Sequence, residues 1–167
     1  MLISIIGPAY AGKDTLATQL KQNWAGKCIL LRTGRECRRR FSEEEMSKDP
    51  NPHAPGFTEE FVRRLIVESW CAAKVRGWPC IIVGNPRTPH QVDWMTATSM
   101  QYDDQILILR MRVTLETQLE RMQQRDGASE EALKLGAARI ERDNGAVDLV
   151  CNQIIGCPFV SLVEVVS

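Results

Sequence analysis

The chain has 167 residues, which is enough for one domain with a substantial apolar core. Its 21 basic and 21 acidic residues balance to a formal net charge of zero. This balance argues against nucleic acid as the main partner, because proteins that bind polyanions carry a basic excess. No apolar run approaches the ~18 residues that a membrane-spanning helix needs, so we expect no membrane partner.

The first apolar run, residues 2–6, leads directly into Gly7 without a preceding basic segment or a cleavage site. It therefore predicts a strand rather than a signal peptide. The six cysteines are scattered without a C-x-x-C pair, which favours reduced thiols over a metal site or a disulfide framework. We expect a cytoplasmic protein.

Five short apolar runs alternate along the chain with segments of helical periodicity. They predict strands, which cover residues 2–6, 28–32, 79–84, 105–111 and 159–165. Continuous apolar runs of this length are typical of strands buried on both faces, as in a parallel sheet. We therefore expect an α/β fold of three layers, in which helices flank a five-stranded parallel sheet through right-handed crossovers.

Helix starts occur between the predicted strands. Residues 13–24 predict the first helix, and Thr58, Thr114 and Ser129 stand as N-caps before three further helical segments. The helix after Thr58 would bury one face, which consists of Phe61, Val62, Leu65, Ile66 and Trp70. Residues 42–57 contain three prolines and mixed charge, so they predict an excursion on the surface.

The segment GPAYAGKDT, residues 7–15, nearly spells the phosphate-binding loop G-x-x-x-x-G-K-S/T between a predicted strand and a predicted helix. Its glycines let backbone N–H groups approach phosphate oxygens, while Lys13 and the helix N-terminus add positive charge. Asp14 departs from the pattern, because the hydroxyl follows one residue later, at Thr15. The residues predicted to bind ATP are Gly7, Ala9, Tyr10, Ala11, Gly12, Lys13, Asp14 and Thr15.

The G-K-D-T spelling resembles the G-K-G-T loop of adenylate kinases and their relatives, with Asp in place of the second Gly. Four further segments resemble these nucleoside monophosphate kinases in the family's order, namely RTGRECRR (32–39), GFTEEFVRRLI (56–66), GNPRTPHQ (84–91) and ERMQQR (120–125). GNPRTPHQ is the most specific, because it differs from the family's G-F-P-R-T-x-x-Q only at Asn85. The resemblance implies a P-loop kinase that uses ATP and Mg²⁺.

The resemblance also implies where the phosphate acceptor binds. Arg87 and Arg38 would hold the acceptor phosphate, and Gln91 would hydrogen-bond its base. Arg39 and Arg40 follow Arg38 directly, so the sequence leaves open which of these arginines faces the site. The remaining residues predicted to bind the acceptor are Thr33, Gly34, Phe57, Gly84 and Asn85.

By the same resemblance, residues 34–76 would form a helical arm that binds the acceptor, and residues 121–139 would form a short lid. Phosphoryl transfer needs charge neutralisation more than covalent chemistry, and arginine binds phosphate bidentately while staying charged. The residues predicted to act in catalysis are Lys13, Arg87, Arg121, Arg125 and Arg139. Arg142 lies one turn from Arg139 and remains an alternative to it.

Two departures from the family concern the metal. The family has Asp before the glycine of G-F-P-R-T, where it organises Mg²⁺, whereas this chain has Val83. Asp14 adds a carboxylate in the loop itself. We consider two roles for Asp14, either organising the metal together with Thr15 or capping the helix.

We predict that the protein transfers a phosphoryl group from ATP to a (deoxy)nucleoside monophosphate, as a monomer or small homo-oligomer. Residues 125–153 also resemble dephospho-CoA kinases and deoxynucleotide kinases, which leaves the acceptor open. One alternative is therefore a small-molecule kinase of the dephospho-CoA type. Another is a nucleotide sensor without turnover, in which Val83 replaces the carboxylate that turnover requires.

Overall fold

The computed structural model describes residues 1–41, 57–126 and 129–166. They form an all-parallel, five-stranded sheet in the order β2-β3-β1-β4-β5. The strands are β1 (Leu2–Ile6), β2 (Ile29–Arg32), β3 (Cys80–Val83), β4 (Ile106–Arg112) and β5 (Val160–Val166). The predicted α/β fold is confirmed, and each strand end lies within one residue of its predicted position.

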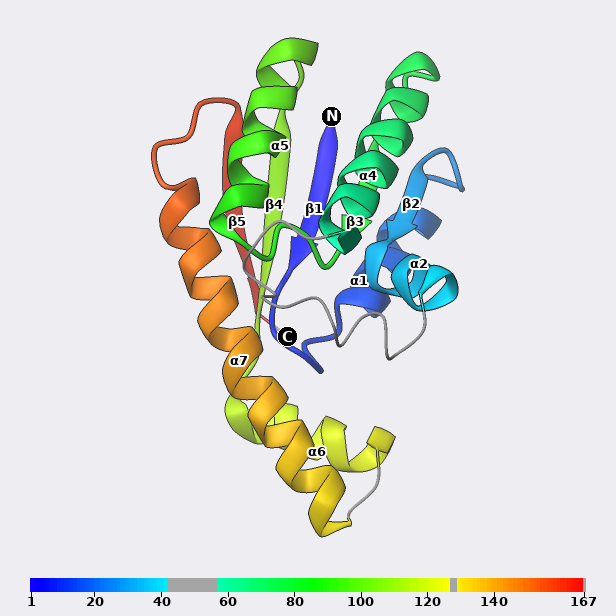
Figure 1. Cartoon of the computed structure of the whole chain (residues 1–167). Coiled ribbons are helices and arrows are strands. Elements are labelled where there is room, and N and C mark those ends of the chain that lie inside the picture. Colours follow the sequence, from blue (N-terminus) through cyan, green and yellow to red (C-terminus); the bar gives the residue numbers. More distant parts are fainter. Residues whose placement is uncertain (42–56, 127–128, 167) are drawn as a thin grey trace.

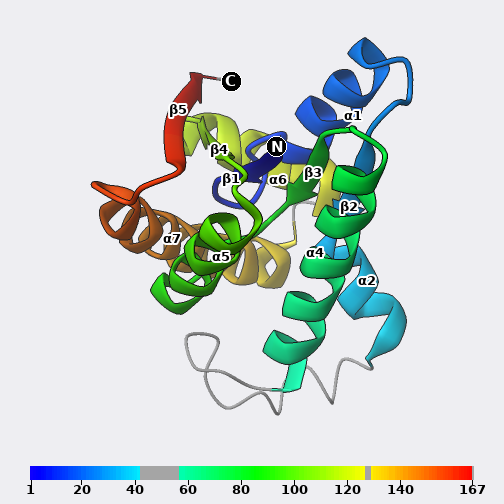
Figure 2. The same cartoon turned by 90° about the horizontal axis from the view of Figure 1, so that it is seen from above.

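Helices cover both faces of the sheet (Figures 1 and 2). They are α1 (Lys13–Asn23), α2 (Thr33–Arg40), α4 (Phe57–Val75), α5 (Pro89–Tyr102), α6 (Leu115–Asp126) and α7 (Glu130–Ile154). In the view from above, α4, α5 and α7 lie on one face and α1 lies on the other. The chain therefore has three layers, with the sheet in the middle.

Each face of the sheet has its own apolar cluster. Ile82 of β3 belongs to the cluster that includes Ile66 and Trp70 of α4, whereas the adjacent Ile81 belongs to the cluster that includes Ala17 of α1. Successive strand residues point to opposite faces, so a strand that is covered on both sides is apolar at every position. This explains why the central strands appear in the sequence as unbroken apolar runs.

The helix starts agree with two of the three predicted caps. The Thr114 hydroxyl accepts a hydrogen bond from the Thr117 amide (3.2 Å) before α6, and the Ser129 carbonyl accepts one from the Leu133 amide (2.9 Å) at the start of α7. The prediction that Thr58 caps α4 is wrong, because α4 already begins at Phe57. Capping preferences alone locate a helix end only to within one or two residues.

Helix α7 is a single helix of 25 residues, which begins beside α6 and continues along part of the sheet (Figure 1). Its second half packs Val150 and Ile154 into the core, while its first half extends beyond the strands beside α6. The predicted surface excursion at residues 42–57 lies outside the described residues except at Phe57, which begins α4. The predicted arm and lid stay predictions.

The six cysteines all carry free thiols in the described structure, as the sequence predicts. None of the helices in the described ranges is long and apolar enough to span a membrane.

Candidate functional site

A cavity of about 560 Å³ opens at the carboxyl ends of β1, β2 and β3. This is the edge at which parallel α/β sheets bind ligands. The cavity walls come from the loop after β1, the start of α2, the loop after β3, and helices α6 and α7. Five elements far apart in the sequence therefore contribute side chains to one concave site.

The loop after β1 depends on glycine at two positions. A Cβ on Gly7 would lie 2.8 Å from the Cβ of Met111 and 3.0 Å from its carbonyl oxygen, so only glycine fits against β4. Gly12 has φ 84° and is the N-cap residue of α1, in a left-handed conformation that glycine adopts without strain. These two glycines let the loop backbone pass closely around the N-terminus of α1.

Most residues of the predicted ATP-binding loop line this cavity. They are Gly7, Ala9, Tyr10, Gly12, Lys13, Asp14 and Thr15. Ala11 differs, because it is fully buried and packs in the apolar cluster beneath the loop.

Lys13 is folded back over the loop, where its ammonium group donates to the carbonyl oxygens of Gly7 (2.8 Å) and Pro8 (2.5 Å). Burial lowers the pKa of Lys13 from 10.5 to about 8, and the positive charges of Arg87 and Arg139 act in the same direction. The carboxylates of Asp143 and Asp14 offset part of this effect on the pKa. Lys13 therefore sits among crowded positive charges, and an anionic ligand would relieve their repulsion.

Arg87 also lines the cavity. Its side chain is exposed to the cavity, and its Nε donates to the carbonyl oxygen of Gly84 (2.7 Å). The protein atoms around it desolvate the guanidinium and lower its pKa, an effect that the carboxylate of Asp143 partly offsets. An arginine keeps its charge under such conditions, so Arg87 remains a cation that faces the cavity.

Three residues predicted to bind the acceptor lie behind the cavity wall. Thr33, Asn85 and Gln91 are at most 5% exposed, and none of them lines the cavity. The Oε1 of Gln91 accepts hydrogen bonds from the Arg87 amide and from Asn85 Nδ2, both at 2.7 Å. Asn85 Oδ1 in turn lies 2.5 Å from the hydroxyl of Thr33.

Gln91 thus supports the wall of the cavity that carries Arg87. The family resemblance instead implied that its side chain would face the acceptor base. Its Nε2 donates to Glu59 Oε2 (2.5 Å), and the indole of Trp94 donates to Glu59 Oε1 (3.0 Å). Sequence reasoning missed Glu59, because nothing local connects the first turn of α4 with α5. Phe57 begins α4, and its side chain lies outside the described part of the chain.

Helix α2 carries Arg38, Arg39 and Arg40, which differ in their position relative to the cavity. Arg38 lines the cavity together with Gly34, whereas Arg39 and Arg40 do not belong to its lining. Arg39 instead pairs with Glu36 (3.3 Å). Sequence reasoning missed Arg35, which also lines the cavity. Arg35 lies one helical turn before Arg38, so a helix predicted over residues 33–40 would have placed Arg35 and Arg38 on one face.

Asp14 does not cap α1, because the N-cap residue is Gly12 and no side-chain hydrogen bond caps that end of the described helix. The carboxylate of Asp14 instead accepts from Arg32 Nε at 2.7 Å, and Arg32 also donates to Thr18 Oγ1 (3.0 Å). Arg32 is the last residue of β2 and lines the cavity. The signal in the sequence that points to Arg32 is its position at the end of the strand predicted over residues 28–32.

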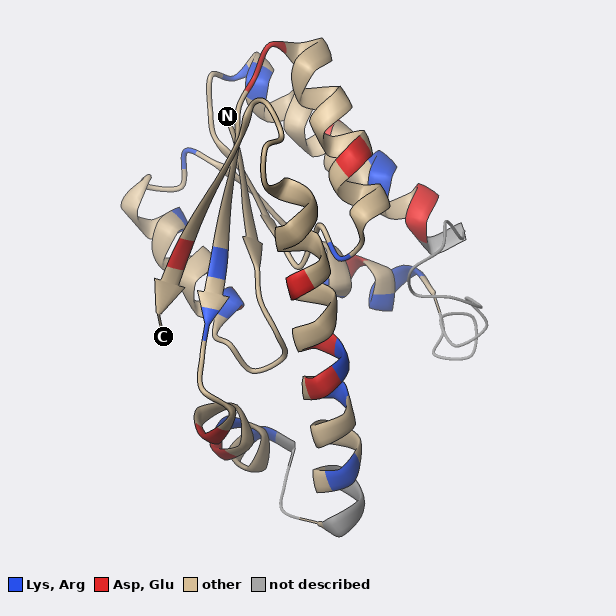
Figure 3. Ribbon diagram, turned by 90° about the vertical axis from the view of Figure 1, so that its left-hand side faces the viewer, with Lys and Arg blue, Asp and Glu red and all other residues tan. Residues whose placement is uncertain are grey.

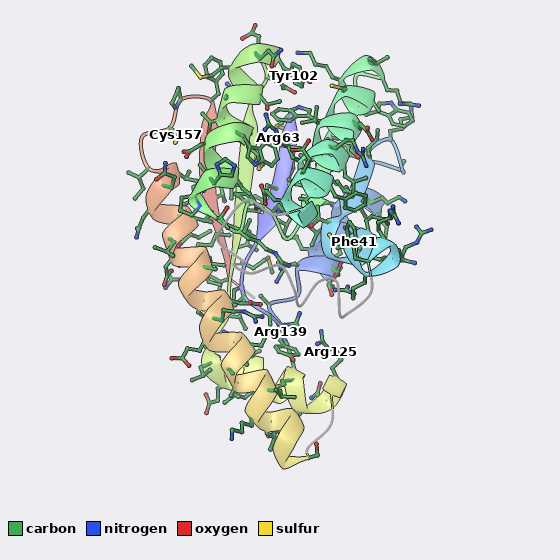
Figure 4. The ribbon with its side chains drawn as sticks, in the orientation of Figure 1. Phe41, Arg63, Tyr102, Arg125, Arg139 and Cys157 are labelled. Atoms are coloured by element: carbon green, nitrogen blue, oxygen red, sulfur yellow. The ribbon has the colours of Figure 1, made fainter. Side chains whose placement is uncertain are left out.

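The predicted lid arginines meet above the loop after β1. Arg121 donates to the carbonyl oxygen of Tyr10 (3.2 Å), and the guanidinium groups of Arg125 and Arg139 lie 4.4 and 6.0 Å from the centre of the Tyr10 ring. Figure 4 shows Arg125 and Arg139 near one another where α6 and α7 pass below the sheet. Arg139 lines the cavity, whereas Arg142 does not belong to its lining.

The cavity is strongly basic. In the described ranges its lining has eight basic side chains, which are Lys13, Arg32, Arg35, Arg38, Arg87, Arg121, Arg125 and Arg139. Its acidic lining residues are Asp14 and Asp143, and Figure 3 shows acidic and basic positions close together along α7. Sequence reasoning missed Asp143, whose carboxylate lies 4.0 Å from Arg139 Nε. Such an excess of positive charge at a glycine loop suits a polyphosphate ligand.

A comparison with protein families agrees with this geometry. Residues 2–148 match the family model AAA_33, described as an AAA domain. A search of curated proteins gave no match. The matched range contains four of the five strands and every cavity-lining residue. The chain therefore belongs to the AAA_33 family and is a P-loop, nucleotide-binding, kinase-like domain.

Proposed function

We propose that the protein transfers the γ-phosphoryl group of ATP to the phosphate of a (deoxy)nucleoside monophosphate, which yields ADP and a nucleoside diphosphate. The observation that carries the proposal is the presence, in one cavity, of two sets of groups that suit phosphate. The loop after β1 and Lys13 line the cavity, and Arg87 and Arg38 line it from the elements that follow β3 and β2. One cavity with two such sets suits a donor and an acceptor that both carry phosphate.

On the donor side, the backbone amides at the start of α1 and Lys13 would hold the ATP phosphates. The Lys13 ammonium would exchange its two carbonyl partners for phosphate oxygens. Arg121, Arg125 and Arg139 approach the same loop from α6 and α7 and would neutralise the charge of the transferred group.

On the acceptor side, Arg87 and Arg38 would bind the monophosphate in line with the donor. The attacking oxygen of a phosphate is already anionic, so this reaction needs no general base. Gln91 and Asn85 would act on the acceptor indirectly, because their hydrogen bonds fix the backbone that carries Arg87.

The residues at the loop fit a magnesium ion. Asp14 and Thr15 both line the cavity beside Lys13 and offer oxygen atoms, the ligands that Mg²⁺ prefers. Mg²⁺ usually keeps several waters and takes one or two protein oxygens together with the phosphates, so two residues are sufficient. A bound ion would neutralise charge between the β- and γ-phosphates. Val83 offers no ligand atom in its side chain, so Asp14 is the residue that would replace the missing carboxylate.

Asp143 favours a second candidate function. Its carboxylate lines the cavity and acts on the pKa of both Lys13 and Arg87. A carboxylate at that place would serve as the base that a hydroxyl acceptor requires. A small-molecule kinase of the dephospho-CoA type is therefore the alternative that the experiment must separate.

The experiment measures ADP formation from ATP with a panel of ribo- and deoxyribonucleoside monophosphates, with dephospho-CoA, and with no acceptor. Stimulation by a monophosphate supports the proposal, and stimulation by dephospho-CoA alone supports the second candidate. ATP binding without transfer to any acceptor would instead indicate a nucleotide sensor.

Two adjacent residues of α2 provide a matched control for this assay. Arg38→Gln removes a guanidinium that lines the cavity, whereas Arg39→Gln removes one that pairs with Glu36 outside it. The proposal requires that Arg38→Gln raises the acceptor KM and that Arg39→Gln does not. Equal effects of the two substitutions would contradict the assignment of Arg38.

A further inference from the structure

Tyr10 combines an unusual backbone conformation with contacts to three arginines. It lies in the loop after β1, lines the cavity and has φ 62°, in the left-handed region. A bulky side chain rarely adopts this conformation, which persists only where the surrounding structure compensates for its strain. The position therefore requires an explanation that a phosphate-binding backbone alone does not provide, because glycine would serve that purpose without strain.

The contacts of Tyr10 supply this explanation. Its carbonyl oxygen accepts from Arg121, and its ring lies under the guanidinium of Arg125, 4.4 Å from the ring centre. Arg139 approaches the same ring from α7 at 6.0 Å. The negative face of an aromatic ring attracts guanidinium groups, and this attraction strengthens where protein excludes water.

These three arginines come from two helices, and three positive charges that gather at one place repel each other. Asp143 compensates part of the charge, since its carboxylate lies 4.0 Å from Arg139 Nε. Tyr10 contributes both of its acceptor surfaces, the carbonyl oxygen and the ring, to the same cluster. The cluster forms at the loop itself.

We propose that Tyr10 is a positioning residue that docks α6 and α7 on the loop and orients Arg121, Arg125 and Arg139 toward the transferred phosphoryl group. The inference rests on the proposed function and deepens it, because it assigns a role to one side chain of the loop beyond phosphate binding. Arginines that already stand at the loop lose less conformational freedom when the donor phosphates arrive. The ring thus acts through the arginines and needs no contact with the substrate.

Three substitutions test this role. Tyr10→Asn removes the ring but keeps a residue that tolerates the left-handed conformation, so the loop backbone is preserved. Tyr10→Phe keeps the ring and serves as the conservative variant. Trp78→Leu is the matched control, since Trp78 also lies under an arginine, Arg76 at 5.9 Å, but does not line the cavity.

The first readout is hydrogen exchange of the α6 and α7 amides in the protein without nucleotide. We expect Tyr10→Asn to lose protection in α6 and in the first half of α7, while Tyr10→Phe and Trp78→Leu keep it. Unchanged protection in Tyr10→Asn would overturn the proposal, and this readout does not depend on any enzymatic activity.

The second readout is the rate of phosphoryl transfer at saturating substrates. We expect Tyr10→Asn to lower kcat about tenfold, as the loss of two cation–π contacts implies, and to leave the acceptor KM unchanged. Tyr10→Phe should restore most of kcat. A kcat that rises in Tyr10→Asn would overturn the proposal, because the ring would then obstruct the arginines.

A double-mutant cycle with Arg125→Gln distinguishes positioning from a general structural effect. If Tyr10 acts through Arg125, the combined loss in kcat is smaller than the product of the two single losses. Losses that multiply would refute the coupling. If no acceptor is phosphorylated but Tyr10→Asn still lowers the amide protection of α6 and α7, the proposed function fails while the docking role of Tyr10 stands.

Discussion

The lowered pKa of Lys13 predicts that ATP binding weakens above pH 8. Burial and the neighbouring arginines lower this pKa to about 8, so the free protein loses the positive charge of Lys13 across the range from pH 7 to pH 9. A bound polyphosphate stabilises the charged ammonium and raises its pKa again. Binding at high pH therefore requires uptake of a proton, and the affinity must fall as the pH rises.

The size of the effect follows from the fraction of charged Lys13. With a pKa of about 8, about nine-tenths of the free protein carries the charge at pH 7 and about one-tenth at pH 9. The affinity for ATP should therefore fall about tenfold between these pH values, which corresponds to ~1.4 kcal/mol.

The assay is the equilibrium binding of ATP without an acceptor, measured by calorimetry at pH 7 and pH 9. Lys13→Arg is the control, because a guanidinium stays charged throughout this pH range. The titration of ATP itself affects both proteins equally, so it cancels in the ratio of their ATP affinities. The affinity of the wild-type protein relative to Lys13→Arg should drop about tenfold at pH 9. An unchanged ratio would refute the reasoning, as would a calorimetric signal without proton uptake at pH 9.

Three further predictions concern packing, the acceptor and the metal. Gly136→Ala should destabilise the protein by about 1–3 kcal/mol and lower its Tm, because the new methyl would lie 1.9 Å from the Sδ of buried Met122. In a Met122→Ala background the same substitution should cost less, and an unchanged Tm of Gly136→Ala would contradict the contact between α6 and α7. Arg87→Lys should lower kcat/KM for the acceptor about 100-fold, because the bidentate fork is lost; an equal loss of ATP affinity would place Arg87 on the donor side instead. Asp14→Asn should reduce turnover and the response of turnover to Mg²⁺ much more than it weakens ATP binding without metal. Arg32→Gln frees the Asp14 carboxylate and should preserve the Mg²⁺ response. A normal Mg²⁺ response in Asp14→Asn would rule out the metal role of Asp14.

The fold and the loop after β1 were predictable because their signals are local. An apolar run of five residues such as 2–6 indicates a buried strand wherever it occurs, and alternation with helical segments indicates a parallel sheet. Gly7, Gly12 and Lys13 lie within seven residues, so their spacing alone identified the turn that approaches phosphate. No distant part of the chain was needed for these inferences.

The orientation of side chains required the tertiary structure. Gln91 resembled a base-binding residue in sequence, but the packing of α4 against α5 brings Glu59 to its amide and keeps it within the wall. Arg38 and Arg39 are neighbours in the sequence, yet only Arg38 lines the cavity in the described structure, because of the rotation of α2 on the sheet.

The sequence by itself therefore determined the class of fold, the position of the phosphate-binding loop and six of the eight basic residues that line the cavity in the described ranges, all but Arg32 and Arg35. Only the tertiary structure decided which cations share the cavity, that Asp14 pairs with Arg32, and that Tyr10 gathers the arginines of α6 and α7. The physical reason is the range of the interactions. Periodicity and glycine conformation act within a few residues, whereas the charges of the site meet through helix packing between segments up to 129 positions apart, as with Tyr10 and Arg139.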